Sequence, residues 1–464
     1  MNCTCFTSSL RYACCAGLTL ALACGSDGDD LVAPPGREPS DPSGDAAVAT
    51  MRTAAIPVAG TAADYDALLR AIGDARVVVL AEAMHGSDEF QRERTRITQR
   101  LVLEKGFTAI AVEGGWAETA RVDEFIRGRG PSTVDEALAT YTGFPSWMMR
   151  TGPVRSLALW LREQNAARGS SQQVGIYGLD LLNLAAAADA VIDHLATADP
   201  PLAERARAAY ACFAPYLADP QGYGAAVAAG ARHCRVEAAE ILDALAARAQ
   251  ATTDSPAARE ARFAALRNAS AVAAAEEFFR ELHDPGGRPW AGRERSMSET
   301  LKAVERHLAG TTGAPAKVVV WTHTSHVGEV RATRADPAED LTVAQRTRER
   351  LGTASFLVAM HTFTGTVRAA EEWGGPGRVL ELEPGLSGSL ADLFHRTGVP
   401  SFSMVLRGGG AARAELERER LEREVGIVYD PRTERDSHYF FSRLAERFDA
   451  AIFLDTTRAV TELQ

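Results

Sequence analysis

Histidine and glutamate side chains follow three apolar runs that lie far apart in this chain. The runs span residues 77–81, 109–112 and 318–321, and the side chains that follow them are Glu82, His85, Glu113, His323 and His326. Runs of β-branched residues predict buried parallel strands, and the ligand crevice of an open α/β sheet lies at the carboxyl ends of its strands. We therefore expect these residues to meet in one active site.

The residue types suit hydrolysis of an ester by water. That reaction needs a base that accepts a proton near neutral pH, and imidazole has an ordinary pKa of about 6.5. We predict His85 as the base, with the carboxylate of Glu82 or Glu113 fixing its tautomer and stabilising the imidazolium. The negative charge that grows on the carbonyl oxygen needs a cationic or N–H donor, and the candidates are Arg94 and His323.

A metal ion is the alternative to a base, because Zn or Mn could activate the water instead. Its ligands would be Glu82, His85, Glu113 and His323. We expect the metal-free mechanism, with no cofactor.

Three more side chains are predicted to contact the substrate, namely Trp116, Arg293 and His326. Arg293 would fit a solvent-exposed charge run equally well, and His326 would fit the role of an orienting partner. Both alternatives stay open at this point.

Several common chemistries lack their motifs. The chain contains no Gly-x-Ser-x-Gly, no His-Glu-x-x-His, no Cys-x-x-Cys and no Gly-x-x-x-x-Gly-Lys-Ser/Thr. A serine nucleophile elbow, the common zinc sites and a P-loop are therefore excluded. The formal net charge of -11 argues against a nucleic-acid partner, since phosphate binding needs clustered basic side chains.

The elements that must position these residues alternate along the first part of the chain. Strands are expected at residues 76–80, 108–112 and 174–177, with helices between them, and again at 317–322, 354–361, 378–382, 402–406 and 450–455. Residues 182–308 instead show Ala- and Leu-rich helical periodicity. We predict an α/β fold with a mostly parallel central sheet flanked by helices, and an all-helical insertion at 182–308.

The N-terminal region is typical of a bacterial lipoprotein. An apolar stretch of about 12 residues precedes Cys24, which is too short to span a bilayer. We predict a signal peptide at 1–23, a lipid anchor on Cys24, a disordered tether at 24–50 and a folded domain at 51–464. The expected location is the bacterial cell envelope, with ordinary secretion as the alternative.

Two cysteines remain after the leader and the lipidated Cys24, namely Cys212 and Cys234. An oxidising compartment favours a disulfide between them. Two buried free thiols are the alternative.

Several separated segments of the chain resemble motifs of the erythromycin esterase family and occur in the same order. They are Ala81-Glu82-Ala83-Met84-His85-Gly86, Val112-Glu113-Gly114-Gly115-Trp116, Phe144-Pro145-Ser146-Trp147, Tyr177-Gly178-Leu179-Asp180, Trp321-Thr322-His323-Thr324-Ser325-His326, Glu372-Trp373-Gly374-Gly375-Pro376 and Ser437-His438-Tyr439-Phe440. The resemblance implies an esterase that opens a macrolide lactone by adding water, as in macrolide resistance. It implies site roles for Glu82, His85, Arg94, Glu113 and His323.

The chain departs from the family pattern at Ala81, where the family has glycine, and at Thr322 and Thr324, where the family has alanine and asparagine. These departures bear on substrate shape more than on chemistry. The wider group includes metal-dependent Tiki proteases and a haem-binding lipoprotein, so a metal-dependent hydrolase and a non-catalytic binder of a macrocycle or haem are alternatives. The expected partner is a small-molecule ester, and the expected state is a monomer.

Overall fold

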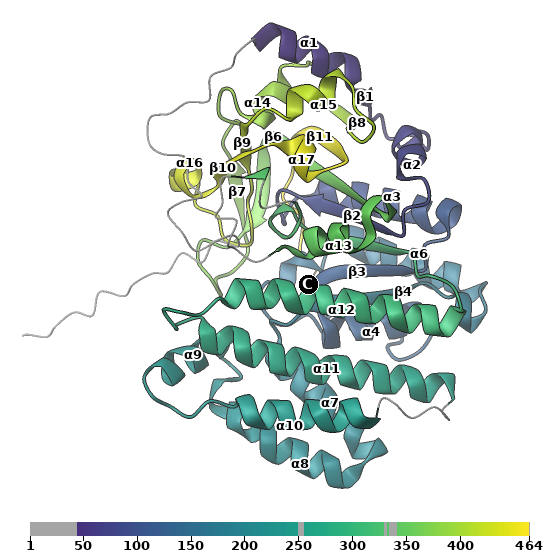
Figure 1. Ribbon diagram of the computed structural model, residues 1–464, viewed down its shortest axis with the longest axis vertical. Helices are drawn as coiled ribbons and strands as arrows, with labels where there is room; N and C mark the ends of the chain where they lie inside the picture. The colour runs from purple at the N-terminus through teal and green to yellow at the C-terminus, as the bar shows by residue number, and fades with distance from the viewer. Residues whose placement is uncertain (1–43, 249–254, 329–331, 334–340, 464) are drawn as a thin grey trace, which may run out of the picture.

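The centre of the molecule is a β-sheet in a computed structural model that describes residues 44–248, 255–328, 332–333 and 341–463 (Figure 1). Its strands are β1 (Ile56–Pro57), β2 (Val77–Glu82), β3 (Ala109–Gly115), β4 (Gly175–Asp180), β5 (Val318–His323), β6 (Ser355–Ala369), β7 (Arg378–Leu382), β8 (Ser401–Val405) and β11 (Ala450–Thr457). Within the described residues, nine strands run in the order β1-β8-β11-β6-β2-β5-β3-β4, with β7 also paired to β6.

The six central strands, from β11 to β4, are parallel. The antiparallel pairs lie at the margins, where β8 pairs with β11, β1 with β8 and β7 with β6. The predicted α/β class with a mostly parallel sheet is therefore confirmed.

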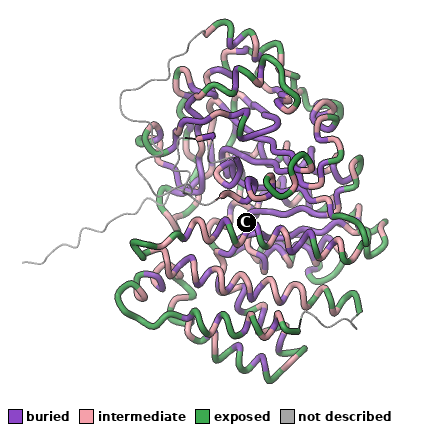
Figure 2. The backbone as a smooth tube through the Cα atoms, viewed as in Figure 1, coloured by how far each residue is buried: buried purple, intermediate pink, exposed green. Residues whose placement is uncertain are grey.

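Helices cover both faces of this sheet. Outside the insertion they are α1 (Gly44–Ala54), α2 (Asp66–Ile72), α3 (Asp88–Lys105), α4 (Trp116–Ile126), α5 (Val134–Leu138), α6 (Gly152–Ala166), α13 (Val343–Leu351), α14 (Leu390–His395), α15 (Ala411–Leu416), α16 (Glu434–Ser437) and α17 (Leu444–Arg447). Alternate residues of β2 face opposite sides: Val78 packs with α3 and α6, and Val79 with α1 and α14. Figure 2 shows the resulting buried layer along the central strands.

The helical insertion lies between β4 and β5 and fills one end of the molecule (Figure 1). Its helices are α7 (Leu184–Ala198), α8 (Pro200–Tyr210), α9 (Pro220–Ala228), α10 (Arg235–Arg248), α11 (Pro256–Glu281) and α12 (Pro289–Thr312). They bury an apolar core of their own, and α12 also packs on the sheet. Cys212 and Cys234 form a disulfide in this core, as predicted.

The folded part begins earlier than the sequence suggests. Residues 44–50, expected in the tether, belong to helix α1. The reason is an apolar face made by Ala47, Val48 and Met51, which are buried against α14 and α15. The predicted leader and the lipidated Cys24 lie outside the described residues.

A two-stranded hairpin, β9 (Arg420–Arg423) and β10 (Tyr439–Ser442), was not expected from the sequence. All four residues of β9 are buried, although three of them are charged. In the described part of the chain, no helix combines the length and the apolar character that crossing a bilayer requires.

Candidate active site

The sheet brings the predicted residues together at the carboxyl ends of its strands. Glu82 and His323 are the last residues of β2 and β5, and the register pairs them with one another. Glu113 lies near the end of β3, beside β5. His85 follows in the turn from β2 to α3, and Arg94 projects from α3.

His85 lies between two carboxylates. Its Nδ1 is 3.1 Å from Oε1 of Glu82, and because a carboxylate only accepts, this contact places the proton on Nδ1. The other nitrogen, Nε2, is 3.6 Å from Oε1 of Glu113 and has no hydrogen-bond partner among the described residues. His85 is 1% exposed, so an acceptor nitrogen is held inside the protein without a donor.

Arg94 neutralises Glu82 on the side away from His85. Its Nη2 is 2.7 Å from Oε2 of Glu82, and its guanidinium lies 4.7 Å from the ring of Trp321. Burial lowers the pKa of Arg94, while the charges of Glu82 and Glu113 oppose that effect. Its Nε is buried and has no acceptor within the described chain, so one N–H remains available to a ligand.

Glu113 accepts hydrogen bonds from four groups. Oε2 accepts from the Thr322 hydroxyl at 3.0 Å and from the His323 backbone N–H at 2.9 Å. Oε1 accepts from Arg293 at 3.1 Å and lies 3.1 Å from Nε2 of His326. Burial alone would raise the pKa of Glu113, but the charges of His326 and Arg293 hold that pKa well below its usual range. Glu113 is therefore a carboxylate.

His323 uses both ring nitrogens within the chain. Nδ1 accepts from the backbone N–H of Ser325 at 3.2 Å, and Nε2 lies 3.2 Å from the carbonyl oxygens of Ala83 and Val425. Burial lowers the pKa of His323 well below its ordinary value, so the ring is neutral. Its centroid lies 4.6 Å from that of His85. The predicted oxyanion donor thus donates to backbone carbonyls and supports the turn that carries His85.

His326 and Arg293 were predicted to contact substrate, but they lie behind Glu113. His326 bridges Glu113 and Glu294, whose charges raise its pKa well above the ordinary value against the effect of burial. Arg293 is 2% exposed and donates to both oxygens of Asp180, at 3.0 and 2.7 Å. The role of orienting partner therefore fits His326, and the solvent-exposed alternative for Arg293 is wrong because its charge is paired inside the protein.

Sequence reasoning assigned no role to Asp180 and Glu294. Asp180 is the last residue of β4, so its position at the carboxyl end of a strand could have marked it as a site residue, as for Glu82 and His323. Glu294 lies within α12, where a glutamate is ordinary, and no sequence signal marks it.

Trp116 is placed away from the site. It packs against Tyr177 and Phe263, with ring centroids 5.9 and 5.5 Å away. Because Trp116 opens α4 on the face that α11 covers, its ring joins the apolar core and does not line the cavity beside His85. The prediction that Trp116 contacts the substrate is therefore wrong.

A small cavity with room for about one water molecule lies beside His85. Its lining residues are Glu82, His85, Arg94, Val112, Glu113, Met148, Met149, Trp321 and Thr322. Pockets for drug-sized ligands usually enclose about 300–1,000 Å³. The cavity thus has charged and apolar lining residues, and it is too small for a macrolide as it stands.

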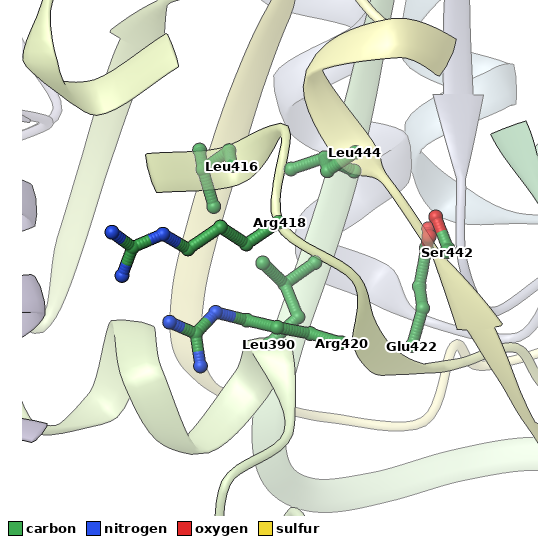
Figure 3. Close-up of a pocket in the computed structure, with 7 residues that line it drawn as sticks. All are labelled: Leu390, Leu416, Arg418, Arg420, Glu422, Ser442 and Leu444. Carbon is green, nitrogen blue, oxygen red and sulfur yellow. The ribbon is translucent and has the colours of Figure 1, made fainter. Parts of the chain in front are cut away.

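A second, shallow pocket, too small to hold a water molecule, lies between α14, α15 and the hairpin (Figure 3). Its lining residues are Leu390, Leu416, Arg418, Arg420, Glu422, Ser442 and Leu444. Figure 3 shows the Arg418 and Arg420 guanidinium groups pointing away from the Glu422 carboxylate. None of the sequence-predicted residues lines this cavity, so the candidate chemistry belongs to the first.

The alternative of a metal site finds no ready ligand set in the described chain. Residues 44–248, 255–328, 332–333 and 341–463 contain no group of three or more His, Cys, Asp or Glu side chains arranged to hold a metal ion. Of the four proposed ligands, His323 has both nitrogens engaged with the chain.

Comparison with solved structures shows the same fold elsewhere. A succinoglycan biosynthesis protein is 19% identical with a TM-score of 0.71, covering 92% of this chain and 100% of that one. A Bacillus cereus protein is also 19% identical, with a TM-score of 0.73 over 91% and 100%. A His-to-Asn mutant of the erythromycin esterase EreC in its open conformation is 14% identical, with a TM-score of 0.59 over 85% and 93%. At these identities the similarity concerns the fold alone.

Comparison of sequences goes further. An erythromycin esterase type II from Escherichia coli is 30% identical over 118 residues, which are 25% of this chain and 26% of that protein. The match thus spans about a quarter of that relative. The erythromycin esterase family model matches residues 102–457, which include Glu113 and His323 and begin after His85. Since this match covers more than half of the chain, the protein belongs to the erythromycin esterase family.

Proposed function

We propose that this protein is a carboxylic ester hydrolase in which His85 activates the attacking water. Family membership supports hydrolysis of macrolide-type esters at the level of the family. The observation that carries the proposal for this chain is the state of His85. Its Nδ1 donates to Glu82, and its Nε2 is an acceptor without a partner at the cavity.

In this mechanism a water molecule in the cavity donates to Nε2 of His85 as its oxygen attacks the ester carbonyl carbon. The proton moves to His85, and the carboxylates of Glu82 and Glu113 stabilise the imidazolium at 3.1 and 3.6 Å. The tetrahedral intermediate then collapses, the bond to the alcohol oxygen breaks, and His85 returns its proton to that oxygen. One water is consumed for each acid and alcohol released.

Arg94 is the candidate that meets the developing oxyanion. Its Nε–H is unpaired at the cavity, and its Nη2 is fixed by Glu82, so the donor is oriented before the reaction begins. His323 has no spare N–H, since Nε2 already faces two carbonyl oxygens. The proposal therefore gives the oxyanion role to Arg94 and a positioning role to His323.

The proposed substrate is a small-molecule ester, with a macrolide lactone as the first candidate, and no nucleic acid takes part. A macrolide needs far more space than the cavity beside His85 offers, so its binding requires the wall to move. We further propose a monomer that is held at the bacterial cell envelope by lipid on Cys24. The disulfide between Cys212 and Cys234 fits an oxidising compartment.

The test compares the wild type with His85→Ala on macrolides and simple esters, with products identified by mass spectrometry. Loss of the base should lower kcat roughly 10² to 10⁴-fold while the fold is retained. His395→Ala is the matched control, because His395 is half-exposed, pairs with Asp455 and lies outside the cavity. Exhaustive chelation should leave wild-type activity unchanged. An unaltered rate in His85→Ala, or activity lost to chelator and restored by Zn or Mn, would refute the mechanism.

A further inference from the structure

The cavity beside His85 is built from two kinds of structure. Most of its lining comes from β2, β3, β5, α3 and the turn after β2. The exceptions are Met148 and Met149, which lie in the connection between α5 and α6. We call residues 146–150 the wall segment.

The regular part of the cavity cannot move aside cheaply. Its strands pair with neighbours on both sides, and the turn after β2 is fixed by backbone hydrogen bonds between Ala83 and Met360 and between Ala83 and Val425. Opening the cavity there would break the central sheet. The wall segment belongs to no strand of the sheet, and its one β-type pairing is the isolated bridge that Thr151, the next residue, forms with Glu462.

The wall segment is held by one backbone hydrogen bond to a distant residue, from the Leu463 N–H to the Arg150 carbonyl at 2.8 Å, and by side chains. The Met148 carbonyl accepts one hydrogen bond, from Nε2 of Gln91 at 3.0 Å. Trp147 packs with Ile427 and Val428, and Ser146 donates to Glu462 at 2.8 Å. The two methionine side chains can therefore rearrange while Trp147 keeps the segment anchored, and methionine is the most adaptable apolar side chain.

The lining of the cavity is chemically mixed. His85, Glu82 and Arg94 are its charged groups, Met148, Met149, Val112 and Trp321 are its apolar ones, and the Arg94 guanidinium lies over the Trp321 ring. An ester carbonyl placed for attack must face His85 and Arg94. The group attached to that carbonyl is then left against the methionines.

We propose that Met148 and Met149 determine specificity: they yield to admit the ester and contact an apolar group next to its carbonyl. This inference rests on the proposed ester hydrolysis. The substrate class is then an ester with a bulky apolar acyl group. The methionines that contact this group would offer no hydrogen-bond partner to a second polar group.

The experiment measures kcat/KM for p-nitrophenyl esters from acetate to octanoate. Met148→Ala and Met149→Ala should raise the octanoate-to-acetate ratio roughly tenfold or more, since one or two methylene groups in an apolar pocket discriminate by that much. Met148→Trp should lower the ratio. Met297→Ala is the matched control, because Met297 is a buried methionine of α12 that packs on the sheet outside the cavity.

A second measurement separates this inference from the proposed function. Trifluoromethyl ketones of the same chain lengths bind ester hydrolases without turnover, and calorimetry would follow their binding to the wild type and the variants. If the protein cleaves no ester but its preference for ketone chain length shifts in the methionine variants, the role of Met148 and Met149 would be supported and the proposed ester hydrolysis refuted. If the enzyme is active and both variants keep the wild-type chain-length preference in turnover and in ketone binding, only the role of Met148 and Met149 would be refuted.

Discussion

Replacement of Glu113 by glutamine tests whether the buried charges behind His85 act as one network. Glu113 accepts hydrogen bonds from four groups, of which Arg293 and His326 are cations. Removing one partner of a buried ion pair typically costs about 3–5 kcal/mol, because the other charge remains buried. Arg293 keeps Asp180 and His326 keeps Glu294, so we expect the lower end, about 3 kcal/mol of unfolding free energy.

Urea unfolding followed by circular dichroism measures this loss, with Thr322→Val as the matched control. Thr322→Val removes one hydrogen bond from an uncharged donor to the same carboxylate, which is worth about 1.5 kcal/mol because the His323 backbone N–H still satisfies that oxygen. If Glu113→Gln costs no more than Thr322→Val, the network is not a set of charge-assisted bonds. The activity of Glu113→Gln should also fall, since an imidazolium on His85 loses one of its two carboxylates.

The contribution of Glu113 to the free energy of unfolding should depend on pH, in a direction set by its pKa. The pKa of Glu113 in the folded protein is held well below its usual range by His326 and Arg293, although burial opposes this. A depressed carboxyl pKa stabilises the fold above the unfolded pKa of about 4.3, and that contribution is lost as the pH falls through the folded value. The stability difference between wild type and Glu113→Gln should therefore be largest near neutral pH and shrink in acid. A difference that grows as the pH falls would contradict the assignment.

The remaining predictions concern the disulfide and the anchor. The double variant Cys212→Ser/Cys234→Ser should lose about 3 kcal/mol of unfolding free energy, by the chain-entropy estimate for a loop with a sequence separation of 22. Urea unfolding would show this, and an unchanged midpoint would contradict it. Cys24→Ala should move the protein from the membrane fraction to the soluble fraction, as immunoblots of the two fractions would reveal. Native protein that is soluble with Met1 retained would remove the lipoprotein hypothesis.

The central strands could be predicted from the sequence because their apolar runs are buried on both faces. The run that begins at Val77 needs no partner to be recognised, and the rule that ligands bind at carboxyl ends then places Glu82, Glu113 and His323 together. The structure puts their strands side by side, as that rule requires. The hairpin strand Arg420–Arg423 escaped prediction, since its charges are buried by partners such as Glu415 and Glu434, which no local pattern reveals.

The roles of individual side chains were harder to predict than their location. Which atoms a histidine faces depends on backbone groups from distant segments, such as the carbonyl oxygen of Val425 at Nε2 of His323. Arg293 shows the same limit, because its carboxylate partner Asp180 lies 113 residues away. Sequence patterns locate a site when strand ends define it, but they do not orient the groups within it.

Thr322, one of the departures from the pattern that the family resemblance implies, falls on the support of the site. It donates its hydroxyl to Oε2 of Glu113 at 3.0 Å, a bond that the alanine expected there cannot make. The same oxygen accepts the His323 backbone N–H, so Thr322 adds a second donor that fixes the carboxylate rotamer. Glu113 can then hold Oε1 toward His326 and toward Nε2 of His85. Because burying several charges stabilises a protein little, the additional bond acts mainly on geometry, which a water-activating histidine between two carboxylates needs.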